Sequence, residues 1–294
     1  MPGASGGLLA RPYRFAATSG SGHYPVQSVT RYVLKRSLPR EFPYSLIGAA
    51  ALAALILLLP LAGTTPRPPA NARAVAFALA AYALVLIPMP LLLHGFLLAA
   101  RNHATPRLLA LGALSGALGL PFALLAGPED LLGRGSGVLV LVALCVANLS
   151  RILAAACVGI SLARYVRSAG VVLIVAAAAV ASDLFSVFAG PTKALLRDDS
   201  PVLDVLVLVF PTFGSALGFG LGVSDFIFLA LFAAASRFLG LRYAASLLGV
   251  CLAAFLALTA GLLLERPLPA LPFVAVAFVL VNADLIVARI ARRR

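Results

Sequence analysis

The chain has 294 residues, of which 62% are hydrophobic and only 11% are charged. Soluble globular domains carry about 25% charged residues, so the composition excludes that class and indicates an integral membrane protein. The net charge of +13 comes from Lys and Arg residues that separate apolar runs and form no basic stripe with aromatic side chains, so nucleic acid is not an expected partner.

The N-terminal residues 1–43 are rich in Gly, Ser, Pro and Arg. They lack the apolar core of a cleavable signal peptide, and we expect them to form a mobile basic arm.

After this arm the sequence divides into eight apolar segments, each long enough to cross a hydrocarbon layer about 30 Å thick as a helix. The segments cover roughly residues 44–62, 74–100, 107–126, 137–163, 169–188, 218–236, 243–264 and 268–288. Pro88 and Pro90 are the expected place for a break in the second segment. A ninth apolar run, about 202–212, is short and ends at Pro211, so we predict an interfacial or re-entrant segment.

The predicted fold class is therefore all-α, a polytopic transmembrane helical bundle of 8–9 spans. A lipid-exposed strand edge would leave backbone groups without hydrogen bonds, and no part of the sequence alternates with period two as a barrel would. Residues 44–163 are expected to form the N-terminal transmembrane helices, and residues 164–294 a second transmembrane region that contains the candidate site.

Charge predicts the orientation of these spans. With eight spans and both termini on one side, that side collects 16 Lys and Arg residues and the other side collects 6. The positive-inside rule then places both termini in the cytoplasm. The Ala-, Leu- and Arg-rich composition is typical of a GC-rich prokaryotic genome, and hence of a protein in the plasma membrane.

Three acids, Asp183, Asp225 and Asp284, fall inside predicted spans. An ionised carboxylate in mid-bilayer costs at least about 2.5 kcal/mol, so each is a functional-site hypothesis. Asp183 is predicted roughly 8 Å below one surface and Asp225 roughly 10 Å below the same surface, at 1.5 Å per helical residue. Asp284 lies at the end of the last span near Arg289 and is interpreted as an interfacial or paired acid.

Small residues are expected to bring the first two acids together. Gly214, Gly218 and Gly222 recur every four residues before Asp225, and Ala176 and Ala179 precede Asp183 at helical spacing. Such stripes let two helices approach closely, although ordinary membrane packing also produces them.

Two carboxylates held close cannot both ionise readily, so the pair shares a proton. One member then takes a proton from water while the other donates to a carbonyl oxygen, which is the chemistry of aspartyl proteases. Neither a metal nor an organic cofactor is needed for this reaction.

Three motifs occur in the order found in intramembrane aspartyl proteases. They are Ser182-Asp183-Leu184 followed by Gly190-Pro191, then Gly222-Val223-Ser224-Asp225 continued by Phe226-Ile227-Phe228, and finally Leu268-Pro269-Ala270-Leu271-Pro272. The ordered set, over roughly residues 169–290, resembles the presenilin and signal peptide peptidase family, with its Gly-x-Gly-Asp and Pro-Ala-Leu motifs. Ser182 stands where the family usually has Tyr, and Ser224 where it has Gly.

The resemblance implies a presenilin-like fold, usually of nine spans, and an intramembrane endopeptidase that cleaves single-span membrane proteins or peptides. It implies that Asp183 and Asp225 are catalytic, and that Gly222, Ser224, Pro269, Ala270 and Leu271 shape the substrate site. The compact loops favour the signal peptide peptidases, which resemble self-sufficient enzymes, so obligate partner subunits are not expected.

Two other functions stay open on the sequence alone. A proton-coupled secondary transporter would also use buried acids and helices broken by Gly and Pro, although no internal repeat is visible. A catalytically silent scaffold is allowed by the two Ser departures.

Other catalytic and metal sites are not supported. The sequence contains no His-Glu-x-x-His motif, which a zinc protease of this kind requires. The Gly-x-Ser-Gly match of a serine protease falls in the N-terminal arm. Cys145, Cys157 and Cys251 are interpreted as small buried hydrophobic residues. Arg151, a cation within a span, is assigned no role.

Overall fold

The computed structural model describes residues 42–61, 72–125, 138–190, 205–213, 215–264, 266 and 268–292. The predicted N-terminal arm lies outside the described residues, except for Phe42 and Pro43. All statements below concern the described residues.

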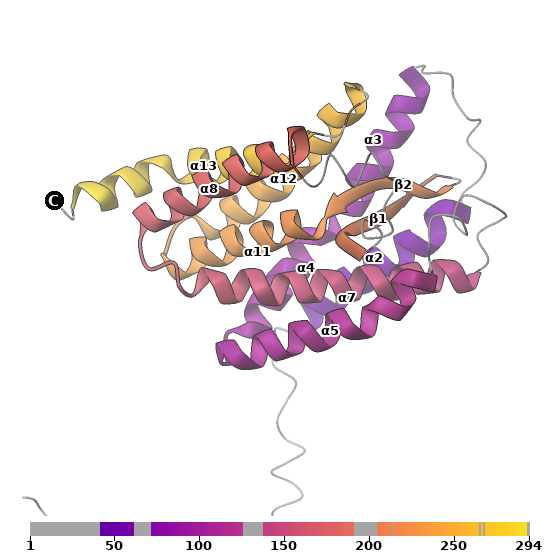
Figure 1. The fold of residues 1–294 in the computed structure, drawn as a ribbon, viewed down its shortest axis with the longest axis horizontal. Coiled ribbons are helices and arrows are strands. Elements are labelled where there is room, and N and C mark those ends of the chain that lie inside the picture. Colours follow the sequence, from indigo (N-terminus) through magenta and orange to yellow (C-terminus); the bar gives the residue numbers. More distant parts are fainter. Residues whose placement is uncertain are drawn as a thin grey trace, which may run out of the picture. The chain divides into compact units, whose positions relative to one another are not determined.

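The described chain is mostly helical and contains one short hairpin (Figure 1). In chain order the elements are α2 (Phe42–Leu58), η1 (Leu59–Leu61), α3 (Ala72–Leu86), α4 (Pro88–Ala100), α5 (Thr105–Leu125), α7 (Val138–Ala163), α8 (Ala169–Phe188), β1 (Val207–Thr212), β2 (Ser215–Gly222), α11 (Val223–Phe238), α12 (Tyr243–Leu263) and α13 (Leu271–Ala291).

Six stretches of helix in the described residues are long and apolar enough to cross a membrane, so the chain is a multi-pass membrane protein. They are Val75–Ala100, Thr105–Leu125, Val138–Ala163, Ala169–Phe188, Tyr243–Leu263 and Leu271–Ala291. A shorter apolar helix covers Pro43–Leu58. The second predicted segment divides at Ile87, between α3 and α4, because Pro88 cannot donate a backbone hydrogen bond within a helix.

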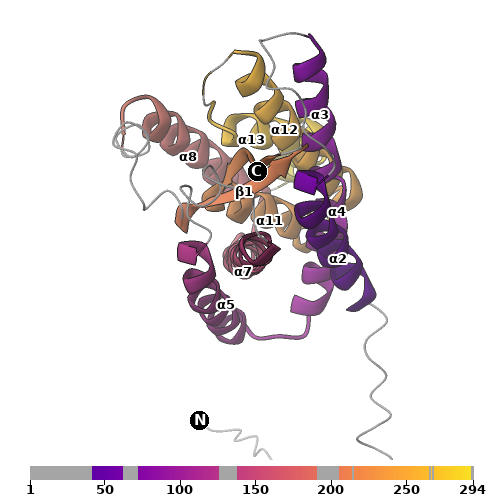
Figure 2. The same cartoon turned by 90° about the vertical axis from the view of Figure 1, so that its right-hand side faces the viewer.

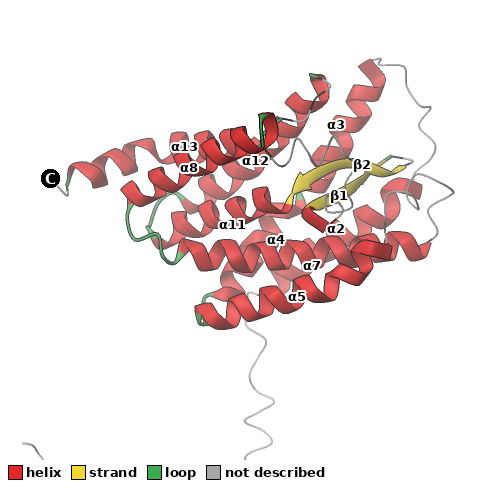
Figure 3. Ribbon diagram, in the orientation of Figure 1, coloured by secondary structure: helices red, strands yellow, loops and turns green. Residues whose placement is uncertain are grey.

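The prediction of an all-α chain is wrong for residues 207–222. β1 and β2 form an antiparallel two-stranded sheet within the helices (Figure 3), with Val207 opposite Gly222 and Val209 opposite Gly220. The predicted span 218–236 is therefore a strand up to Gly222 and a helix only from Val223. Gly218 and Gly222 lie on β2 rather than on a helix face, because pairing with β1 favours the extended backbone. Gly214, the third glycine of the predicted face, lies outside the described residues.

Helix α7 packs against α5, against α11 and against strand β1 (Figure 2). The residues of helix α11 from Leu229 to Ser236 are all buried, so this part of the helix is enclosed on every side. Close approach of α7 and α11 requires Gly159, because a methyl group there would overlap the carbonyl oxygen of Ile227. Cys145, Cys157 and Cys251 are buried and unpaired, as predicted.

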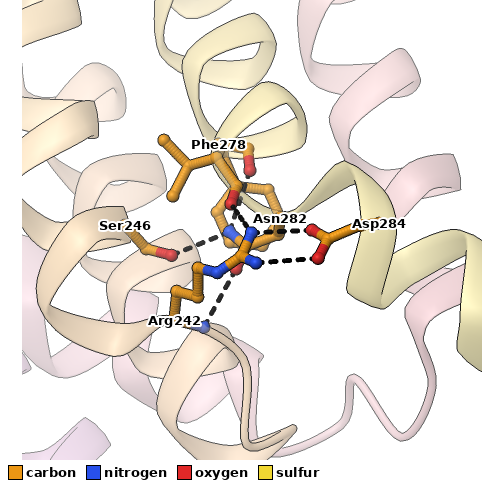
Figure 4. A network of polar contacts seen from close by, with 6 residues as sticks. Arg242, Ser246, Phe278, Asn282 and Asp284 are labelled. Atoms are coloured by element: carbon orange, nitrogen blue, oxygen red, sulfur yellow. Dashed lines mark hydrogen bonds and ion pairs between the residues drawn. The ribbon is translucent and has the colours of Figure 1, made fainter.

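The turn between α11 and α12 is bound to the C-terminal half of α13 by polar contacts (Figure 4). The Asn282 side chain, 0% exposed, accepts from the Arg242 backbone N–H at 3.0 Å and donates to Ser246 Oγ at 2.8 Å. The Arg242 guanidinium donates to both oxygens of Asp284, at 2.6 and 2.7 Å. Arg289 binds the carbonyl oxygens of Leu239 and Gly240. Asp284 is thus a paired acid, and its partner is Arg242 rather than Arg289.

Replacing Asn282 should destabilise this junction. Asn282→Ala leaves the buried Ser246 hydroxyl and the Arg242 N–H without their partner, which costs about 1–3 kcal/mol of unfolding free energy. Denaturant unfolding in detergent micelles measures this loss. Asp284→Asn is the matched control, because its exposed ion pair is screened by solvent and should contribute less. Equal losses in both variants would contradict the assignment of the buried amide as the main contact.

Candidate active site

Asp183 lies near the end of α8 and binds the beginning of α13. Its Oδ2 accepts a hydrogen bond of 2.9 Å from the backbone N–H of Leu271, the first residue of α13. The first N–H groups of a helix have no partner within the helix, so a carboxylate from α8 satisfies one of them. The Pro-Ala-Leu segment is therefore directly attached to Asp183.

Asp225 lies in the first turn of α11, just after β2. Its Oδ2 accepts a hydrogen bond of 3.1 Å from the backbone N–H of Gly222, the N-cap residue of the same helix. This is half of a capping box, in which the third helical residue reaches back to the cap. A Cβ built on Gly222 would lie 2.9 Å from Asp225 Oδ2, so only glycine leaves this carboxylate its present position.

The two acids are connected through the segment before α13, because Asp183 binds Leu271 and the adjacent Ala270 lines the same cavity as Asp225. Both side chains are half-buried. Within the part of the chain that the structure describes, each carboxyl group uses Oδ2 for its backbone hydrogen bond, and Oδ1 makes none. The arrangement leaves one oxygen of each acid for a shared proton or a water molecule.

One edge of the hairpin leads to Asp225. The N–H and C=O groups of Val209 both bind the side chain of Asn148, so they point away from β2. Because hydrogen-bonded and non-hydrogen-bonded pairs alternate in an antiparallel sheet, the opposite residue Gly220 points its own N–H and C=O away from β1. Gly222 points the same way, and its N–H is the one that binds Asp225.

A cavity of about 420 Å³ lies along this edge. It is lined mainly by apolar side chains, with Asp225 and Arg266 as its charged residues. Its walls come from β2, from the C-terminal part of α12 and from the segment before α13, and they include Phe219, Gly220, Leu221, Leu262, Leu268 and Ala270. An exposed strand edge in an apolar cavity with a carboxylate at one end is suited to a peptide in an extended conformation.

The structure brings most of the predicted site residues together. One backbone hydrogen bond joins Asp183 to Leu271 and another joins Asp225 to Gly222, and Ala270 lines the cavity together with Asp225. Pro269 is buried beside Ala270 and has no contact with the cavity lining that is described. Ser224 is exposed, and the structure shows no contact that gives it a role in the site.

Two residues that hold the hairpin are not predicted from the sequence. Asn148 and Arg151 lie one turn apart on α7, and both bind β1. A signal was present, because an amide and a guanidinium at helical spacing inside an apolar span require polar partners. Their partners could not be named without knowing that a strand passes α7.

Among the described residues, no group of three or more His, Cys, Asp or Glu side chains is placed to hold a metal ion. Comparison with protein-family models, with curated proteins and with solved structures finds no match to this chain. The resemblance to the presenilin and signal peptide peptidase family therefore rests on the three motifs and stays a proposal.

A methyl group at Gly222 should disturb the site without unfolding it. In Gly222→Ala the new Cβ meets the flexible end of Asp225, so the carboxylate moves and the backbone stays. Because small misplacements of a catalytic group cost about 10²-fold, we expect hydrolysis of a single-span peptide to fall by about that factor. Gly170→Ala is the control, since its Cβ would enter open space beside Ser168. Unchanged hydrolysis by Gly222→Ala would contradict the placement of Asp225.

Proposed function

We propose that this protein is an intramembrane aspartyl protease that cleaves peptide bonds in single-span transmembrane segments. The observation that carries the proposal is the position of Asp225 at the end of an open strand edge in an apolar cavity, whose lining residue Ala270 is adjacent to Leu271, the residue that binds Asp183. The sequence motifs support it as well, because Asp183 of the first motif binds Leu271 of the third, and Asp225 of the second lines the cavity with Leu268 and Ala270 of the third.

The reaction needs only the two acids and water. With one proton shared between them, the ionised carboxylate removes a proton from water, and the oxygen of that water attacks the scissile carbonyl carbon. The protonated acid donates its proton to the carbonyl oxygen, which forms a neutral tetrahedral intermediate. The nitrogen then takes up the proton that the first acid removed from water, while a hydroxyl group of the intermediate returns its proton to the other acid. The C–N bond breaks, the carboxylic acid and amine products leave, and the pair again shares one proton.

The substrate binds in an extended conformation. A transmembrane helix uses its N–H and C=O groups internally, so it must unwind before a strand edge can pair with it. The outward N–H and C=O of Gly220 then bind the substrate backbone, and the apolar walls receive its side chains. Because Gly220 lies two residues before Gly222, the paired substrate runs directly toward Asp225.

A non-catalytic alternative is that the two aspartates serve only as helix caps. Each binds an N–H at a helix N-terminus, and such contacts stabilise helices whether or not any chemistry occurs. Asparagine is as good a capping acceptor as aspartate, yet it cannot exchange protons. Replacement by Asn therefore separates the two roles.

The experiment compares purified wild type with Asp183→Asn and Asp225→Asn on a panel of single-span peptides in vesicles. Loss of either acid removes general acid–base catalysis, so we expect cleavage to fall by a factor of about 10³ or more while the unfolding temperature is preserved. Asp284→Asn is the control. Asp284 lies far along α13 from Leu271 and pairs with Arg242, so this variant should cleave normally.

Three outcomes would overturn the proposal. Full cleavage by both Asn variants would assign the aspartates to capping. Proton-coupled solute uptake by vesicles containing a wild-type protein without cleavage would favour a transporter. Binding of single-span proteins without cleavage or uptake would favour a silent scaffold.

The orientation in this proposal follows the charge distribution, because the excess of Lys and Arg at the termini and in alternate loops favours a cytoplasmic C-terminus. The Ala-, Leu- and Arg-rich composition favours the plasma membrane of a prokaryotic cell. The compact loops favour an enzyme that acts without obligate partner subunits.

A further inference from the structure

We infer that Asn148 and Arg151 are positioning residues, which hold the hairpin in its binding-competent form before any substrate arrives. This inference rests on the proposed function, because it concerns how an extended peptide finds a prepared strand edge. Neither residue contacts the candidate catalytic carboxylates; both act through β1.

The hairpin cannot be expected to keep its form by itself. An isolated two-stranded hairpin is marginally stable at best, and within the described residues no third strand extends this one. The outer edge of β1 also carries N–H and C=O groups that have no water to bind if they lie within a membrane. A β1 edge without partners would favour opening of the hairpin.

Two side chains of α7 occupy that outer edge. The carboxamide of Asn148 accepts from the Val209 N–H at 3.2 Å and donates to the Val209 carbonyl oxygen, and so takes the place of a neighbouring strand. The Arg151 guanidinium donates to the Val207 carbonyl oxygen at 2.8 Å. Asn148 is 0% exposed and Arg151 is 8% exposed, so these bonds lie in the protein interior.

The spacing of the two elements matches. Residues three apart on a helix are separated by about 4.5 Å along its axis, and residues two apart on a strand by about 6.7 Å. The longer reach of the arginine covers the difference. One face of α7 thus binds the two successive outward-facing residues of β1.

The consequence appears on the opposite edge of the sheet. Val207 pairs with Gly222 and Val209 pairs with Gly220, so fixing β1 also fixes the two residues of β2 that face Asp225 and the cavity. With β1 occupied by α7, the edge of β2 is left for the substrate. If the hairpin is ordered before the substrate arrives, binding does not lose the free energy of ordering it. The affinity for substrate is therefore higher.

The test is a split between KM and kcat. The leucine side chain of Asn148→Leu has a similar size but cannot form hydrogen bonds, so only a minor fraction of the molecules keeps the binding-competent hairpin. The apparent affinity for substrate falls in proportion to that populated fraction. We expect KM for a single-span peptide to rise by about tenfold or more, with kcat within about twofold of wild type. A merely structural role would lower kcat through loss of active protein and leave KM unchanged.

Arg151 and Ser161 supply the matched variants. Arg151→Met keeps the apolar stem but removes the donor, so KM should rise, whereas Arg151→Lys keeps a cationic donor and should restore part of the affinity. Ser161 is a buried polar residue of the same helix whose Oγ has no hydrogen-bond partner among the described residues. Ser161→Ala should therefore leave KM and kcat unchanged.

A second measurement does not depend on proteolysis. Amide hydrogen exchange of the free protein in micelles, resolved for Leu208, Val209 and Phe210, should be at least about tenfold faster in Asn148→Leu than in wild type or Ser161→Ala. Unchanged exchange at these three amides would overturn the inference. If wild type cleaves no peptide but exchange still responds to Asn148, the proposed function fails while the attachment of the hairpin stands.

Discussion

Backbone groups inside a hydrocarbon layer must find hydrogen-bond partners within the protein, and the site of this molecule is built around one exception to helical structure. At residues 207–222 the chain leaves the helical form, in which those partners are automatic. The backbone groups on the inner edges of the two strands pair with each other. On the outer edge of β1, the backbone of Val207 binds Arg151 of α7 and the backbone of Val209 binds Asn148 of α7. On β2, Asp225 takes the N–H of Gly222, and the groups of Gly220 face the cavity.

The same requirement explains how Asp225 at the end of this edge and Asp183 at the beginning of α13 are accommodated. Their mutual repulsion and their removal from water oppose ionisation of both groups. Each, however, binds an N–H at the N-terminus of a helix, where the helix dipole favours negative charge. These opposing effects suit a pair that keeps one proton and one charge. The two hydrogen bonds also attach the acids to helix ends, because Asp183 binds the first residue of α13 and Asp225 binds the cap of α11.

Helix α13 connects the parts of the molecule that carry the two acids. Its first residue binds Asp183 of α8, and α8 packs chiefly on α13. Its C-terminal half is bound through Asn282 to the turn that ends α11, the helix that begins with Asp225. The polar junction at Asn282 therefore joins α13 to the end of α11 that lies away from Asp225.

The sequence by itself determined the membrane class, the approximate bounds of the long helices and the three motifs, because apolar composition and segment length are local properties. It also identified Asp183, Asp225 and the Pro-Ala-Leu segment as candidates, since a charge in an apolar run stands out without any fold. It did not reveal the hairpin. The glycines at 218 and 222 fit a helix face and a strand equally well, and the partner strand is what makes the extended form favourable. The roles of Asn148 and Arg151 were decided only by the tertiary structure, because hydrogen bonds between α7 and β1 join residues 56 and 61 positions apart. The spacing of these residues along the chain does not predict the contacts, because the contacts form only when α7 and β1 pack together.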